Sequence, residues 1–164
     1  MKKIYKAKEG ATFGKDKAEL YGKALEDIEK KHNGILTPSV VLNEARNKSN
    51  PLHNYFNWNN NDAGEKYRLV QARLLINHIE IVIVHEGTEK ETRAYVNVSN
   101  VTEEGDKNQI YVTVERALTN KEYRRQTLAN AIREAEYWKN KYKEFKELSS
   151  IFQAIKKTKI KFRI

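Results

Sequence analysis

The sequence contains no cysteine, and only two prolines and seven glycines interrupt its 164 residues. The absence of cysteine excludes disulfide bonds, thiolate zinc sites, iron–sulfur clusters and a thiol nucleophile. The longest apolar runs, at residues 74–76 and 81–84, are far shorter than the roughly 20 residues that span a bilayer. No apolar stretch follows the start Met1-Lys2-Lys3, so we expect no secretory signal and a cytoplasmic protein that does not enter membranes.

Charge of both signs is abundant, but it is unevenly placed along the chain. There are 31 Lys and Arg against 22 Asp and Glu, a formal net charge of +9. Residues 119–164 carry a net +8, whereas residues 79–118 carry a net −4. A basic C-terminal segment of this kind favours a polyanionic partner.

The length suits one domain with its own core, so we expect residues 1–164 to form a single domain. The hydrophobic pattern divides it into a helical part at 1–78, a β part at 79–118 and a long basic helix with its tail at 119–164. In the first part, apolar spacings of three and four with cap signals predict helices over about residues 16–32, 37–46 and 62–77.

Alternation with a period of two predicts strands over about residues 79–84, 91–98 and 109–116. From Asn120 to about Lys157 there is neither Pro nor Gly, and heptad-like apolar spacing predicts one coiled-coil-like helix about 55 Å long. Helices therefore cluster before and after the strands. The predicted fold class is α+β: an N-terminal helical part, a three-stranded antiparallel β-meander and a long C-terminal helix.

The connection at residues 47–61 is rich in asparagine, yet it holds Tyr55, Phe56 and Trp58. Large side chains in so short a segment predict an ordered loop that packs against the 62–77 helix and orients it against the 37–46 helix. The alternative is that these aromatic side chains form a recognition surface.

Signatures of catalysis and metal binding fail on spacing. The segment from Gly10 to Asp16 is one residue short of a P-loop between its glycines, and Asp16 stands where a Mg²⁺-binding hydroxyl is required. His78 and His85 flank a predicted strand at an odd separation, which places them on opposite faces. We therefore expect no enzymatic activity, no metal and no cofactor.

Basic residues interleaved with aromatic ones dominate the C-terminal part. Such a pattern suits contacts with the phosphates of a nucleic acid, and we favour DNA over RNA. The predicted contacts are Arg124, Arg125, Arg133, Lys139, Lys143, Lys156, Lys157, Lys159, Lys161 and Arg163. The alternative is a solvated helix face, since Glu134, Glu136, Glu144 and Glu147 partly neutralise these cations.

A second candidate for DNA contact is the 62–77 helix, where Arg68, Gln71 and Arg73 could contact base edges as in a helix-turn-helix. The connection at residues 47–61 is much longer than the turn of that motif. The sequence therefore favours the alternative that Arg68 and Arg73 pack their stems and pair with carboxylates.

The apolar seam of the C-terminal helix predicts a helix–helix interface, formed by Trp138, Tyr142, Phe145 and Phe152. A 55 Å helix is too long to bury its whole seam in one small domain, so we expect a homodimer. The alternative is a helix that breaks near Ser149-Ser150 and folds back. The seam also supports a second function, a protein–protein interaction module that serves as a virion or assembly component or as an inhibitor of a host protein.

A motif spread over residues 34–76 carries a resemblance. It comprises Leu36-Thr37-Pro38, Val41, Ala45-Arg46, Pro51-Leu52-His53, Phe56, Trp58, Ala63, Tyr67-Arg68, Gln71-Ala72-Arg73 and Leu75-Ile76. It resembles a largely uncharacterised family of small proteins encoded by bacteriophages and prophages. The resemblance implies an origin in a mobile element and a place in the host cytoplasm or the virion, and it transfers no catalytic residue.

Overall fold

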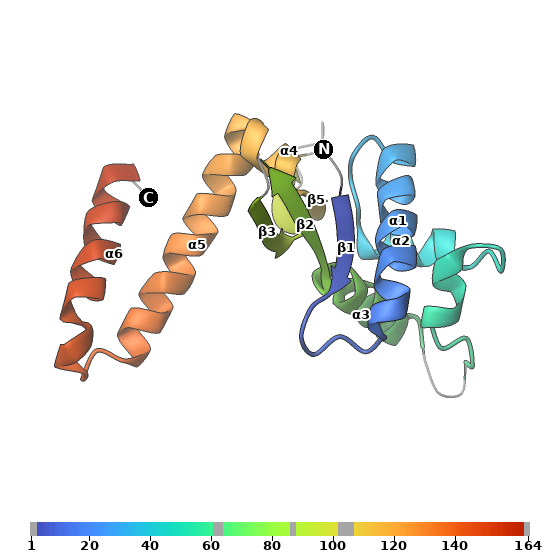
Figure 1. Cartoon of the computed structure of the whole chain (residues 1–164), viewed down its shortest axis with the longest axis horizontal. Helices are drawn as coiled ribbons and strands as arrows, with labels where there is room; N and C mark the ends of the chain where they lie inside the picture. Colours follow the sequence, from blue (N-terminus) through green and yellow to red (C-terminus); the bar gives the residue numbers. More distant parts are fainter. Residues whose placement is uncertain (1–2, 61–63, 86–87, 102–106, 163–164) are drawn as a thin grey trace. The chain divides into compact units, whose positions relative to one another are not determined.

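The computed structural model describes residues 3–60, 64–85, 88–101 and 107–162 (Figure 1). The chain divides into two compact units, Met1–Arg116 and Ala117–Ile164. This boundary lies close to the expected change from the β part to the C-terminal part, and a single domain over residues 1–164 stays a prediction. Among the described residues, no helix is both long enough and apolar enough to cross a bilayer.

Antiparallel strands and helices in the N-terminal unit confirm the α+β fold class (Figure 1). A three-stranded sheet has the order β1-β2-β3, from Lys3–Ala7, Ile79–His85 and Thr88–Arg93. A two-stranded sheet pairs β4 with β5, from Tyr95–Val101 and Lys107–Thr113.

The strands differ from the expected meander in three ways, and one is that the strand expected at 109–116 ends at Thr113 and is followed directly by a helix. Strand β1 supplies one edge of the three-stranded sheet, although the sequence analysis assigns no strand there. The expected strand at 91–98 is divided at Ala94, whose N–H donates to the carbonyl of Ile79 and whose carbonyl accepts from Val114 N–H. The chain therefore leaves the first sheet at Ala94 and enters the second.

The three N-terminal helices lie where the apolar spacing predicts them, at α1 (Lys15–Lys31), α2 (Pro38–Ala45) and α3 (Glu65–Asn77). Thr37 caps α2 by accepting a hydrogen bond from Val40 N–H at 3.1 Å, and Pro38 occupies the first turn. Helix α1 ends where Asn33 and Gly34 take positive φ angles. The predicted capping box begins at Asp62, which lies outside the described residues.

The core of the N-terminal unit forms where α1, α2 and α3 meet the three-stranded sheet. Its fully buried side chains include Leu25, Leu42, Leu75 and Ile79. The loop at 47–61 contains the short 3-10 helix η1 (Pro51–Tyr55), and Phe56 is buried while Tyr55 and Trp58 pack against the core. The prediction of an ordered, packed loop is confirmed.

The C-terminal part contains α4 (Val114–Thr119), α5 (Lys121–Lys141), the 3-10 turn η2 (Lys146–Leu148) and α6 (Ser149–Phe162). The prediction of one helix from 120 to 157 is therefore wrong. Helix α5 ends at Lys141, and its 21 residues extend only about 32 Å. The break allows α6 to pack on α5, which is the fold-back alternative with its turn at 142–145 and not at Ser149-Ser150.

Candidate nucleic-acid interface

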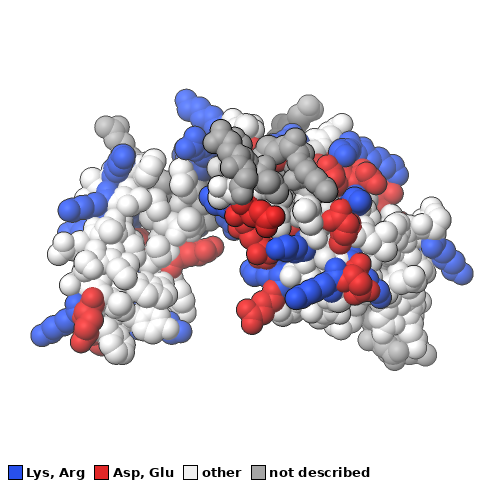
Figure 2. Space-filling view, viewed as in Figure 1, with Lys and Arg blue, Asp and Glu red and all other residues white. Residues whose placement is uncertain are grey.

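The two units differ sharply in charge. The unit at 117–164 has thirteen Lys and Arg against five Glu, a net +8, whereas the unit at 1–116 has eighteen against seventeen, a net +1. Figure 2 shows Lys and Arg projecting around the α5–α6 hairpin beside some acidic side chains, and residues of both signs interspersed over the other unit. Nearly all of the excess positive charge therefore belongs to one structural unit.

An aromatic cluster joins the two helices of the hairpin. The ring of Trp138 on α5 lies 6.0 Å from that of Phe152 on α6 and 5.4 Å from that of Tyr142 at the turn. Phe145 continues the cluster, with its ring 6.3 Å from that of Tyr142. The four predicted interface residues thus lie together, but they contact one another within one chain.

One partly buried ion pair also links the helices. Lys159 Nζ on α6 lies 2.9 Å from a carboxylate oxygen of Glu136 on α5. On the outer surface of α5, Arg125 pairs with Glu122, which lowers the pKa of that carboxyl. Lys159 and Arg125 are therefore already engaged within the protein.

The other cations that are predicted to contact phosphates make fewer contacts within the protein. Arg133 donates to the side-chain oxygen of Asn130. Six others make no ion pair with any residue that the structure describes; they are Arg124, Lys139, Lys143, Lys156, Lys157 and Lys161. On α6, Lys156, Lys157 and Lys161 are exposed, while Phe152 and Ile155 are half-buried. Arg163 lies outside the described residues.

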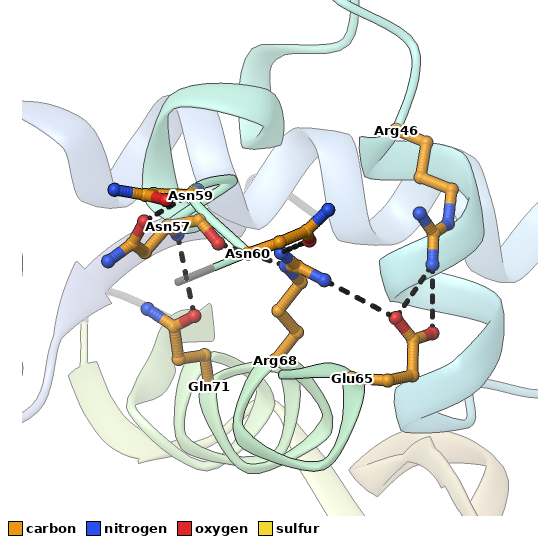
Figure 3. A network of polar contacts seen from close by, with 7 residues as sticks. All are labelled: Arg46, Asn57, Asn59, Asn60, Glu65, Arg68 and Gln71. Carbon is orange, nitrogen blue, oxygen red and sulfur yellow. Dashed lines mark hydrogen bonds and ion pairs between the residues drawn. The ribbon is translucent and has the colours of Figure 1, made fainter. Parts of the chain in front are cut away.

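Arg68 has a different environment from these surface cations. Its side chain is only 5% exposed, and its guanidinium lies 5.5 Å from the centre of the Trp58 ring. Nε donates to the carbonyl of Asn57 at 2.9 Å, and NH2 donates to Asn60 Oδ1 at 2.7 Å (Figure 3). The alternative of internal packing and pairing therefore holds for Arg68, and we remove it from the candidate interface.

The other two residues of the predicted base-reading set differ from each other. Gln71 is half-buried, and its side-chain oxygen lies 3.5 Å from Asn57 N (Figure 3). Arg73 is exposed on the same helix. The structure therefore does not bring Arg68, Gln71 and Arg73 together on one surface.

The network around Arg68 holds the asparagine-rich loop against α2 and α3. Arg46 NH2 donates to both carboxylate oxygens of Glu65 at 2.8 Å (Figure 3). Trp58 donates its indole N–H to the carbonyl of His53, and the two rings stack at 4.9 Å. Several residues of the motif at 34–76, among them Arg46, His53 and Trp58, thus have packing or hydrogen-bonding roles.

One hollow of the N-terminal unit has a mainly uncharged lining. This open hollow of about 430 Å³ is lined mainly by aromatic and neutral side chains, among them Phe13, Tyr21, Tyr55 and Tyr67. Burial raises the pKa of Tyr21 and Tyr55 above the ordinary phenol value, so both stay protonated and uncharged. Within the described ranges, no group of three His, Cys, Asp or Glu side chains is placed to hold a metal ion.

Comparison with known proteins gives no family to which the chain can be assigned. No family model, curated protein or solved structure matches it. The resemblance to phage and prophage proteins therefore stays a prediction.

Proposed function

We propose that the protein is a non-enzymatic DNA-binding protein of a phage or another mobile element, and that its C-terminal helical hairpin binds phosphates. The observation that carries this proposal is the confinement of the net charge to the hairpin unit, +8 against +1. Charge of one sign concentrated on one surface raises the local concentration of a polyanion and accelerates its association.

The arrangement of the cations supports phosphate contact. Lys156, Lys157 and Lys161 extend from one short helix, and none pairs with a described carboxylate. At 1.5 Å per residue, the 14 residues of α6 are about 21 Å long, roughly six base pairs at 3.4 Å each. One helix can therefore follow several consecutive phosphates without reading their bases.

Binding measured against salt tests the proposal. The full chain should bind a DNA duplex with a log affinity that falls linearly as log salt rises, because each phosphate contact releases condensed counterions. Changing Lys156, Lys157 and Lys161 together to Glu should reduce the steepness of that slope by up to about 2.7, at about 0.9 for each contact.

A matched control makes the same change of charge in the other unit. Lys8, Lys48 and Lys66 are exposed residues of the N-terminal unit, and their replacement by Glu also changes the net charge by six. This variant should keep a slope close to that of the unchanged protein. An equal reduction of the slope in both variants would show that total charge alone governs binding. Absence of binding at low salt would contradict the proposal.

Exposed apolar side chains favour a second function, a protein–protein interaction module of a phage. Among the described residues after 116, only Ala117 and Ile132 are buried apolar side chains. Seven large ones are exposed: Leu118, Tyr137, Trp138, Phe145, Ile151, Ile160 and Phe162. An exposed apolar surface of this kind favours the binding of a partner chain, either a host or phage protein or a second copy.

Sedimentation at two salt concentrations tests whether the partner is a second copy of the chain in a homodimer. A 55 Å helix cannot support the dimer, because α5 and α6 are separate, but the exposed apolar side chains are compatible with one. A homodimer should tighten as salt screens the repulsion between two +8 units. A 19.2 kDa monomer at both concentrations, at micromolar protein, would exclude it.

A further inference from the structure

Tyr137 has the largest exposed fraction of any large hydrophobic side chain in the part of the chain that the structure describes. Its exposed fraction is 74%, above the 68% of Ile160 and the 60% of Leu118. Its ring contacts no other aromatic ring, and its hydroxyl makes no hydrogen bond with a described residue. Most of the Tyr137 side chain is thus accessible to another flat group.

Two cations lie on either side of this ring along the helix. Arg133 and Lys141 are four residues before and after Tyr137 on α5, so all three lie on one face. Each step of four residues rises about 6 Å, which makes the row about 12 Å long. Both cations are exposed, and neither pairs with a described carboxylate. We call Arg133, Tyr137 and Lys141 the α5 row.

We infer that the α5 row binds single-stranded nucleic acid, with an unpaired base stacked on Tyr137 and the flanking phosphates held by Arg133 and Lys141. The inference rests on the proposed function and adds a single strand, beside the duplex, as a ligand of the same basic unit. A single strand presents free base faces, whereas a duplex hides them between neighbouring base pairs. The row is about as long as three or four stacked nucleotides at 3.4 Å each.

Charge argues against a second copy of the chain on this face. A second copy would bring two units of +8 together, and its own row would place cations opposite cations.

The nearest carboxylate on the same side is Glu134, three residues before Tyr137, and it is exposed. Glu134 should repel a bound phosphate, so Glu134→Gln is expected to strengthen binding severalfold.

The experiment compares one labelled strand of about 20 nucleotides with its own duplex, using fluorescence anisotropy and the full chain. Tyr137→Ala should weaken binding of the single strand by on the order of ten-fold or more, because alanine cannot stack. Tyr137→Phe should retain affinity within about two-fold, since the phenyl ring stacks as well. Duplex affinity should change by less than about two-fold in both variants.

Tyr67→Ala is the matched control, because Tyr67 is also an exposed tyrosine on a helix, with 54% of its surface accessible, and it lies in the other unit. It should leave binding of both ligands unchanged. Thermal melting of the Tyr137 variants should match the unchanged chain, since the exposed ring has no packing partner to lose.

The outcomes separate this inference from the proposed function. If Tyr137→Ala leaves single-strand affinity unchanged while the Lys156, Lys157 and Lys161 variant loses duplex binding, the inference fails and the proposed function stands. Equal losses for strand and duplex, or a loss in Tyr137→Phe as large as in Tyr137→Ala, also overturn stacking. If Tyr137→Ala instead dissociates a dimer, the face binds a second copy. Absence of binding to both ligands removes the proposed function together with the inference.

Discussion

The ring of Tyr5 on β1 lies directly against Gly22 on α1, in the space that a Cβ at position 22 would occupy. The same helix face fixes the strand at two further points. Glu19 accepts from Tyr5 N–H at 2.8 Å, and Glu26 accepts from the Tyr5 hydroxyl at 2.9 Å. Positions 19, 22 and 26 thus form a strip on α1 that receives Tyr5, and the glycine allows the close approach of strand and helix.

Gly22→Ala should destabilise the N-terminal unit. In an exposed helix interior this change stabilises by about 1 kcal/mol, because glycine loses more backbone entropy. At position 22 the new methyl group would collide with the inner atoms of the Tyr5 ring, which cannot swing aside. We expect a net loss of about 1–3 kcal/mol, measured by thermal melting. Lys17→Ala, at an exposed position of the same helix, should change stability little, and an unchanged melting temperature for Gly22→Ala would contradict the contact.

Gly34→Ala and Gly10→Ala form a matched pair. Both glycines have positive φ, +76° and +83°, so alanine is strained at either position by about 1 kcal/mol. Gly10 has open space around it, whereas a Cβ on Gly34 would displace Arg116, whose NH1 donates to the carbonyl of Asn33 at 2.7 Å. Gly34→Ala should therefore cost about 1 kcal/mol more than Gly10→Ala. Denaturant midpoints of the two variants measure the difference, and equal midpoints would show that Arg116 contributes nothing.

Arg68→Met should destabilise the protein and leave nucleic-acid binding intact in the folded fraction. The change keeps an unbranched stem but removes the donors to the Asn57 carbonyl and the Asn60 side chain. We expect a loss of about 1–3 kcal/mol, because the half-buried carbonyl of Asn57 and the exposed side chain of Asn60 lose their donor. Arg73→Met, exposed on the same helix, should cost less than about 0.5 kcal/mol. A folded Arg68→Met protein with normal stability and abolished DNA binding would instead place Arg68 at the interface.

Stability should fall on the alkaline side because of buried tyrosines. Burial raises the pKa of Tyr5, Tyr21, Tyr55 and Tyr95 above 10.0, and the hydrogen bond to Glu26 raises that of Tyr5 further. A raised pKa in the folded state gives stability that is full below pH 10 and is lost as the pH rises above it. Ultraviolet titration of phenolate should show these tyrosines ionising later than the rest, together with unfolding. Ionisation of all nine tyrosines near pH 10 in the folded chain would contradict this.

The sequence predicts the elements whose signal is local. Ala18, Tyr21, Leu25 and Ile28 recur at helical spacing and are buried on α1, and Thr37-Pro38 marks the start of α2. Strand β1 has no such signal, because it is five residues long and has Lys at positions 3 and 6. Its pairing partner β2 lies more than 70 residues away, and a contact of that range leaves no pattern in the neighbouring residues.

The end of α5 is hidden for a related reason. No Pro or Gly marks the turn at 142–145, and the apolar spacing continues through it. The turn brings Trp138 against Phe152 and Lys159 against Glu136, which are contacts between segments and not local preferences. Periodicity alone therefore cannot distinguish a long helix from a hairpin whose two arms share one apolar seam.

The sequence predicts the net charge of the candidate site. It does not predict which of the cations are exposed and available for binding. Counting Lys and Arg locates the basic unit, but it treats every cation as exposed. Arg68 is buried because its partners are the backbone of Asn57 and the side chain of Asn60, eleven and eight residues earlier in the loop. The engagement of Lys159 with Glu136 depends in the same way on the fold-back of α6.

Each of the two units contains one of the two tryptophans of the chain. Trp58 lies within 6 Å of the guanidinium groups of Arg46 and Arg68 in the first unit, and Trp138 belongs to the aromatic cluster of the hairpin. With either tryptophan replaced by phenylalanine, the tryptophan emission of the chain reports on one unit alone. Coincident transitions from the two single-tryptophan proteins would mean that the units unfold as one cooperative body, and separate transitions would mean that the hairpin melts independently.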